Sequence, residues 1–96
     1  MNTFLVHISI DTGGLAHDAV KVLREQESER AAQLAASGNL LRLWRVPGRW
    51  ENWGLWAAPD DVQLNLILKS LPLYKFMRIT VHSLSSHPSD PGEATR

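Results

Sequence analysis

Residues 40–57, LLRLWRVPGRWENWGLWA, are two runs of large apolar and basic side chains separated by Pro, Gly and Arg at positions 47–49. Runs of this length, rich in Leu, Val and Trp, are typical of β-strands, and a Pro-Gly pair between them is a turn signal. We therefore expect a hairpin whose strands are residues 40–46 and 50–57.

A helix is predicted on each side of this hairpin, and a further strand beyond each helix. Residues 15–37 lack Pro and Gly and end at Gly38, while residues 59–70 begin with Pro and two Asp. Both patterns are typical of helices. Residues 4–10 and 74–83 are predicted strands, since apolar side chains alternate in the first. The order strand-helix-strand-strand-helix-strand predicts a ferredoxin-like α+β fold, an antiparallel sheet with both helices on one face.

The length of the chain predicts one domain. It has 96 residues, of which 44% are hydrophobic, enough for a modest core. We expect the domain to span residues 1–84. Residues 85–96 are polar and contain Pro, so they are expected to form an extended C-terminal arm.

Apolar side chains are expected on both faces of the sheet. Phe4 and Val6 alternate with Leu5, and Trp56 alternates with Leu55. Because the helices cover one face only, the other needs a second cover. The simplest cover is another copy of the chain, which predicts a homodimer or a higher homo-oligomer.

Composition and missing motifs exclude several classes of function. Ten Lys and Arg balance ten Asp and Glu, which argues against a nucleic-acid partner or an anionic membrane. The absence of Cys excludes disulfides and thiolate metal sites. The N-terminus does not resemble a signal peptide, and no apolar stretch could cross a membrane, so we expect a cytoplasmic protein. Phosphate-loop, nucleophile-elbow and HExxH motifs are also missing.

Glu27 is the strongest candidate catalytic residue. It falls at the edge of the apolar stripe of the first helix, between Leu23 and Leu34. A carboxylate there is costly unless it is paired or used. One interpretation is an exposed ion pair with Arg24 or Arg30. The other is a general base whose pKa is raised by burial, so that it can both take and return a proton.

Arg45 is the candidate anion-binding residue. It shares a face of its predicted strand with Leu43, where a guanidinium needs an anion. That anion is either Glu27 or Glu51 of the protein, or a substrate. Of the four tryptophans, Trp44 and Trp56 are the candidates for apolar walls of a small-molecule site, although packing in the core or at an interface is the commoner role.

Two further polar residues are candidate substrate ligands. His7 lies in the first strand, without a second histidine or carboxylate there at metal-ligand spacing. Asn65 lies among leucines on the short helix, where its amide either satisfies packing needs or binds substrate. No metal site and no cofactor are predicted.

Four segments together resemble one known family. They are Gly38, residues 41–48 (LRLWRVPG), residues 68–74 (LKSLPLY) and residues 84–89 (LSSHPS). Their order and spacing are similar to those of the muconolactone Δ-isomerase family, and the resemblance spans nearly the whole chain.

The resemblance implies a ferredoxin-like fold that dimerises sheet to sheet and can assemble to decamers. It also implies cofactor-free isomerisation of a carboxymethyl-butenolide, by removal of a proton from one ring carbon and its return to another. Glu27 matches the family's glutamate and Arg45 its arginine. The family's second-helix histidine falls on Asn65, and its first-strand arginine falls on His7.

These observations predict a cofactor-independent isomerase or cyclase acting on a lactone or another oxygenated small molecule. Because the site has lost a basic residue and gained apolar surface relative to the family pattern, we expect a larger or less anionic substrate, such as a polyketide- or terpenoid-type intermediate of secondary metabolism. One alternative is a cofactor-free monooxygenase of the same architecture. The other is a non-catalytic binding or assembly module.

Overall fold

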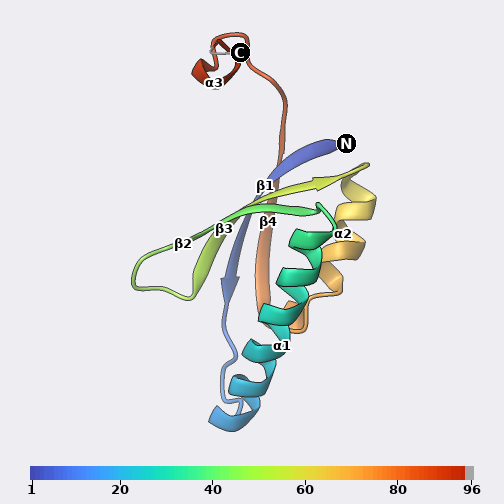
Figure 1. Cartoon of the computed structure of the whole chain (residues 1–96). Coiled ribbons are helices and arrows are strands. Elements are labelled where there is room, and N and C mark those ends of the chain that lie inside the picture. The colour runs from blue at the N-terminus through green and yellow to red at the C-terminus, as the bar shows by residue number, and fades with distance from the viewer. Residues whose placement is uncertain (95–96) are drawn as a thin grey trace.

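The predicted order of strands and helices is confirmed. The computed structural model describes residues 1–94, and the bounds of its elements lie within a few residues of the predicted ones (Figure 1). The elements are β1 (Asn2–Ile10), α1 (His17–Ala36), β2 (Leu40–Arg45), β3 (Glu51–Ala58), α2 (Asp61–Lys69), the 3-10 turn η1 (Tyr74–Phe76), β4 (Met77–Leu84) and α3 (Pro91–Ala94).

The four strands form one antiparallel sheet in the order β2-β3-β1-β4. Both long helices lie on the same side of this sheet, while the other side carries no helix (Figure 1). The chain therefore has the ferredoxin-like α+β fold. The register shifts between Leu40 and Arg42, so a bulge leaves Leu41 without a partner in β3.

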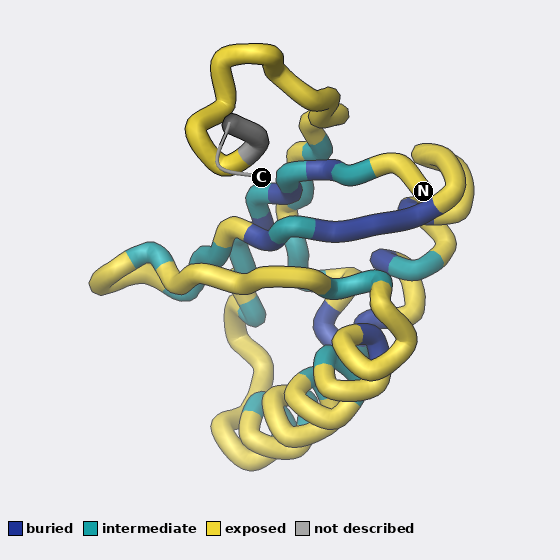
Figure 2. Tube along the Cα trace, turned by 45° about the horizontal axis from the view of Figure 1, so that its top comes forward, coloured by how far each residue is buried: buried dark blue, intermediate teal, exposed yellow. Residues whose placement is uncertain are grey.

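The core lies between the sheet and the helices, and Figure 2 shows the buried residues gathered there. Phe4, Val6 and Ile8 form the sheet side of the core, as the alternation in β1 predicts. Of the residues of α1, only Leu34 is buried, and it lies in the last turns of the helix. The N-terminal part of α1 is consequently not packed tightly onto the sheet.

The ends of the helices follow from local hydrogen bonding. Gly38 adopts φ +84°, and the amides of Gly38 and Asn39 donate to the carbonyls of Ala35 and Leu34 at 3.1 and 2.9 Å, which ends α1 in a Schellman motif. The second helix begins at Asp61, later than predicted, because Asp60 is its N-cap. Within residues 1–94, no helix combines the length and hydropathy needed to cross a membrane.

The C-terminal segment leaves the sheet after β4 and ends in the short helix α3, away from the rest of the chain (Figure 1). The predicted arm, residues 85–96, is described as far as residue 94. Its last two residues, 95 and 96, lie outside the described part.

Candidate active site

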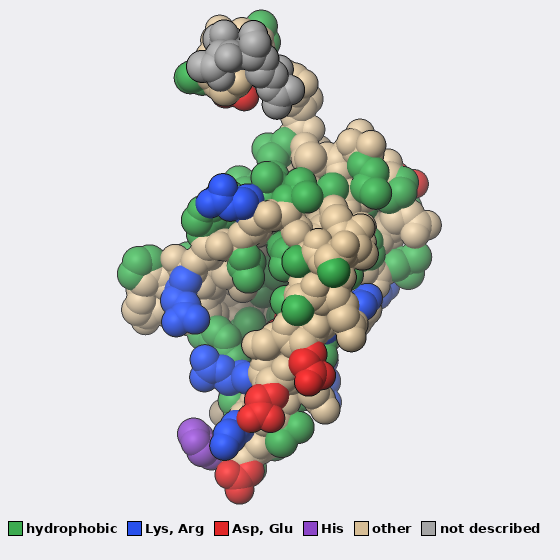
Figure 3. All heavy atoms as spheres, viewed as in Figure 1, with side chains coloured by type: hydrophobic (Ala, Val, Ile, Leu, Met, Phe, Trp, Pro, Cys, Tyr) green, Lys and Arg blue, Asp and Glu red, His purple; other side chains and the backbone are tan. Residues whose placement is uncertain are grey.

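A cavity opens between α1 and the β2–β3 hairpin, on the helix-covered side of the sheet. Its inner part has a volume of about 230 Å³ and its outer part about 550 Å³. In Figure 3 the recess between hairpin and helix is lined by apolar side chains, with basic side chains along its rim. Both parts are lined by Arg24, Leu43, Arg45, Trp50 and Asn52. The inner part adds Ile10, Glu27, Ser28, Ala31 and Leu73, and the outer part adds Gly48, Arg49 and Glu51.

Glu27 lies at the inner end of this cavity and is half-buried. Burial raises the pKa of its carboxyl group, because desolvation penalises the charged form. The backbone N–H of Leu73 donates a hydrogen bond to Oε1 of Glu27 at 2.9 Å, and this bond lowers the pKa in opposition to burial. The net direction is upward, which suits a group that must both accept and release a proton.

The alternative of a simple surface ion pair for Glu27 is not what the structure shows. Arg30 donates hydrogen bonds to Ser70 and Gln33, both at 3.0 Å. Arg24 lies over the ring of Trp50, with its guanidinium carbon 5.1 Å from the ring centroid. Among the described residues no ion pair to Glu27 is found within 4.0 Å.

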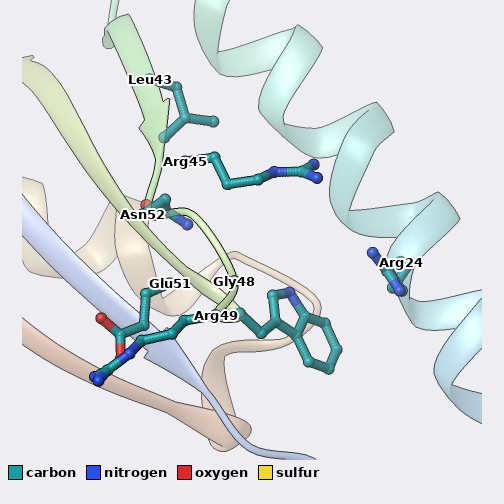
Figure 4. A pocket seen from close by; sticks show the side chains of 8 residues that line it. Arg24, Leu43, Arg45, Gly48, Arg49, Glu51 and Asn52 are labelled. Atoms are coloured by element: carbon teal, nitrogen blue, oxygen red, sulfur yellow. The ribbon is translucent and has the colours of Figure 1, made fainter.

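Strand pairing places Arg45 on the same side of the sheet as the helices. Arg45 pairs with Asn52, and Leu43 pairs with Gly54, so these four positions share the helix-facing side. Figure 4 shows the Arg45 side chain reaching from β2 towards α1, across the cavity. The predicted base and the predicted anion-binding residue therefore line one cavity.

The Arg45 guanidinium has no carboxylate partner in the described part of the chain. Glu51, one of the two expected partners, instead contacts His7 at 3.2 Å and Arg49 at 3.6 Å. The other, Glu27, is not within ion-pair distance of Arg45. Arg45 thus presents an unbalanced positive charge to the cavity.

Trp56 is packed in the core next to the cavity, and it is only 2% exposed. Its ring occupies space that a side chain at Gly54 would fill, since a Cβ there would lie 2.5 Å from Nε1 of Trp56 and 3.4 Å from Leu43. Trp56 is therefore a core residue beside Gly54 and is not among the residues that line the cavity.

The structure does not bring His7 and Trp44 to this cavity within one chain. His7 and Trp44 both pair with Trp53, on the face of the sheet that carries no helix. The His7 ring contacts that of Trp53 at a centroid distance of 4.6 Å. We call this helix-free side the open face.

Asn65 also lies away from the cavity, exposed on α2. Conversely, three of the polar or aromatic residues that line both parts of the cavity were not predicted as site residues: Arg24, Trp50 and Asn52. Asn52 carries a buried Oδ1 for which no hydrogen-bond partner is found among the described residues. The pairing of Arg45 with Asn52 is the signal that would have identified it, but this register is visible only in the folded sheet.

The arrangement is suited to proton transfer on an oxygenated molecule. A carboxyl group with a raised pKa lies in a cavity that also presents a guanidinium, which can stabilise negative charge developing on a substrate oxygen. Within residues 1–94, no three His, Asp or Glu side chains lie close enough together to hold a metal ion.

Comparisons with known proteins agree on one family. The family model described as muconolactone delta-isomerase matches residues 3–90. The muconolactone Delta-isomerase of Acinetobacter baylyi is 29% identical over 84 residues, covering 88% of this chain and 84% of that protein. The enzyme of the same name from Pseudomonas aeruginosa is 36% identical over 67 residues, covering 70% of each chain.

Comparison with solved structures identifies the same family. A crystal structure of muconolactone isomerase superposes with a TM-score of 0.84 at 29% sequence identity, covering 93% of this chain and 94% of the other. The similarity thus extends over the whole sheet and both long helices.

Proposed function

Because the chain belongs to the muconolactone Δ-isomerase family and is therefore an isomerase of a small molecule, we propose that it moves a double bond by proton transfer through Glu27. The observation that carries this proposal is the half-buried Glu27 carboxyl group, with its raised pKa, facing the same cavity as an unpaired Arg45. No metal or cofactor is needed for such a step.

The proposed reaction starts with ionised Glu27 removing a proton from a carbon next to a conjugated carbonyl system. The electron pair of the broken C–H bond moves into that system and gives a dienolate, whose oxygen carries the negative charge. Arg45 stabilises this charge from the opposite wall of the cavity. The protonated carboxyl group of Glu27 then returns its proton to a different carbon, so that the double bond has moved and no atom is lost.

The test is turnover of muconolactone, the substrate in the relatives' name, followed by NMR in D₂O. Wild-type protein should isomerise it and incorporate deuterium at the carbon that is reprotonated. Glu27→Gln should lower kcat by about 10²- to 10⁴-fold, the usual contribution of a general acid-base. Wild-type kcat/KM should rise with pH through the raised pKa of Glu27, because a base must be ionised to act.

Glu29→Gln is the matched control. Glu29 lies on the same helix, is exposed and does not line the cavity, so its substitution should leave turnover unchanged. If Glu27→Gln folds and keeps wild-type turnover, the proposed role of Glu27 is wrong. If wild-type protein neither turns over muconolactone nor exchanges its protons, the proposed reaction is wrong for this substrate.

Ring closure is the second reaction that the same two groups support. A carbanion generated by Glu27 can attack an electrophilic carbon of the same molecule instead of being reprotonated. This would suit a polyketide- or terpenoid-type intermediate of secondary metabolism. Product analysis separates the two reactions, since isomerisation shifts a double bond while cyclisation forms a carbon–carbon bond.

We further propose that the open face is covered by a second copy of the chain, giving a homodimer or a larger homo-oligomer. This face carries Leu5, Leu55 and Trp53, and Trp44 beside them is 43% exposed. Trp53→Arg should yield a lighter species in sedimentation analysis. Val22→Arg, at an equally apolar exposed position on α1, should not. The cytoplasmic location expected from the sequence stays a prediction.

A further inference from the structure

The outer cavity has an excess of positive charge that Arg45 alone does not explain. Three arginines line it, Arg24, Arg45 and Arg49, against one glutamate, Glu51. Glu51 lies 3.6 Å from Arg49, so it balances that cation, and it also contacts His7. Among the described residues, Arg24 and Arg45 are left without a carboxylate within ion-pair distance.

Arg24 and Arg45 approach the cavity from opposite walls. Arg45 reaches out from β2, whereas Arg24 projects from α1 (Figure 4). Two unpaired guanidiniums facing one cavity repel each other, and an anion between them removes that repulsion. Two unpaired guanidinium groups on opposite walls of one cavity are thus the arrangement expected of an anion-binding site.

Trp50 keeps Arg24 in position without consuming its hydrogen-bond donors. The guanidinium carbon of Arg24 lies 5.1 Å from the centroid of the Trp50 ring, and Trp50 itself lines both parts of the cavity. A guanidinium placed over an aromatic ring is attracted through its positive charge, while its N–H groups remain free to bind an anion. No hydrogen bond from the Arg24 side chain is found within the described residues.

The position of Arg24 on α1 places it beside Glu27. The two residues are three positions apart on α1, hence on adjoining turns of one face, and residues so spaced have Cβ atoms about 5–6 Å apart. Glu27 lies at the inner end of the cavity, while Arg24 borders both the inner and the outer part. An anionic group held by Arg24 would therefore lie in the same cavity as the carboxyl group of Glu27.

We propose that Arg24, held by Trp50, is a substrate-binding residue that holds the carboxylate of the substrate beside the carboxyl group of Glu27. This inference rests on the proposed function and assigns different tasks to the two arginines. Arg24 binds the carboxylate in the ground state and in the transition state alike, whereas Arg45 stabilises the charge that develops on the dienolate. It also reverses the expectation of a less anionic substrate.

The experiment compares muconolactone, which carries a carboxylate, with its uncharged methyl ester. Arg24→Gln should raise KM for the acid by about 10- to 100-fold, the range for losing a hydrogen-bonded charge contact, with little change in kcat. KM for the ester should not change. Arg24→Lys should restore part of the affinity, since it keeps the charge and loses the two-pronged geometry. Lys21→Gln is the control, because it removes one cation from the same helix without touching the cavity.

The same variants are also measured in a Glu27→Gln background, as the dissociation constant of muconolactone followed by tryptophan fluorescence. This separates the two proposals: binding that depends on Arg24 in that background supports the present one even if Glu27 proves not to be the base. Three results overturn it: wild-type protein that does not prefer the acid to the ester, Arg24→Gln changing KM for both equally, or Arg24→Gln changing neither. An equal change for both would assign Arg24 a purely structural contact with Trp50.

Discussion

Two arginine–tryptophan contacts in this chain have nearly the same geometry but lie in opposite surroundings. Arg24 lies 5.1 Å from the Trp50 ring centroid, and Arg42 lies 5.0 Å from that of Trp44. The first contact joins α1 to the residue just before β3, beside a cavity that contains a carboxyl group. The second joins neighbours on one strand, on the open face. The residue types are the same in both pairs, so they do not show which pair belongs to the candidate site. The side of the sheet on which each pair lies does.

The strongest test of this difference is to remove one cation from each side of β2. Arg45→Gln should lower kcat for isomerisation by about 10²-fold or more, because the developing oxyanion loses its charged partner. Arg42→Gln, three positions away on the same strand, should change kcat by less than about twofold, since Arg42 faces the open side. Sedimentation analysis at the assay concentration checks that Arg42→Gln leaves self-association unchanged. Equal losses in both variants would mean that the helix-covered side holds no special site.

A smaller effect is expected from filling space on the cavity side of β3. A Cβ at Gly54 would lie 2.5 Å from the ring of Trp56, a residue that is only 2% exposed. Gly54→Ala should therefore lower the free energy of unfolding by about 1–3 kcal/mol, the usual cost of overpacking. Urea titration measures it. Gly14→Ala is the control, because no atom lies within 4 Å of its Cβ position. A loss of stability in Gly14→Ala as large as that in Gly54→Ala would argue against the steric explanation.

Most of the fold was predictable from the sequence because it depends on local periodicity and on turn residues. The alternation of Phe4, Val6 and Ile8 gave the buried face of β1, and Gly38 gave the end of α1. Glu27 was predictable for the same reason, since a polar residue at the edge of an apolar helical stripe is visible at helical spacing. Alternation along β2 predicted that Arg45 shares a face with Leu43, and the strand pairing shows that this face is the helix-covered side.

The remaining site residues depend on contacts between elements, which periodicity does not specify. His7 and Trp44 are candidates from the sequence because they are a polar and an aromatic strand residue, but the register puts them on the open face. The position of Arg24 on the first helix does not by itself distinguish it from a solvent-exposed arginine. Its place in the site depends on the β2–β3 hairpin, which folds back beside α1. The roles of His7 and Trp44 in substrate binding stay predictions.

The smallest expected effect concerns the stability cost of keeping Glu27 inside. Its folded-state pKa is raised by burial, so the folded protein holds this proton more tightly than the unfolded chain does. The resulting stabilisation is present at pH values below the unfolded-state pKa and is lost as pH rises through the folded-state pKa. Glu27→Gln removes this dependence, so its stability relative to wild type should increase from acidic to neutral pH and then level off.

The size of this effect should be below about 1 kcal/mol, because Glu27 is only half-buried and solvent screens its charge. Urea titrations at several pH values measure the difference between the two proteins, with the exposed Glu29→Gln as the flat reference. A difference that falls with rising pH would mean that the Leu73 hydrogen bond outweighs desolvation and that the pKa of Glu27 is lowered. Glu27 would then be too weak a base for the proposed role, because a strongly ionised carboxylate binds protons poorly at neutral pH. A stability measurement on this one side chain therefore tests the chemistry independently of any substrate.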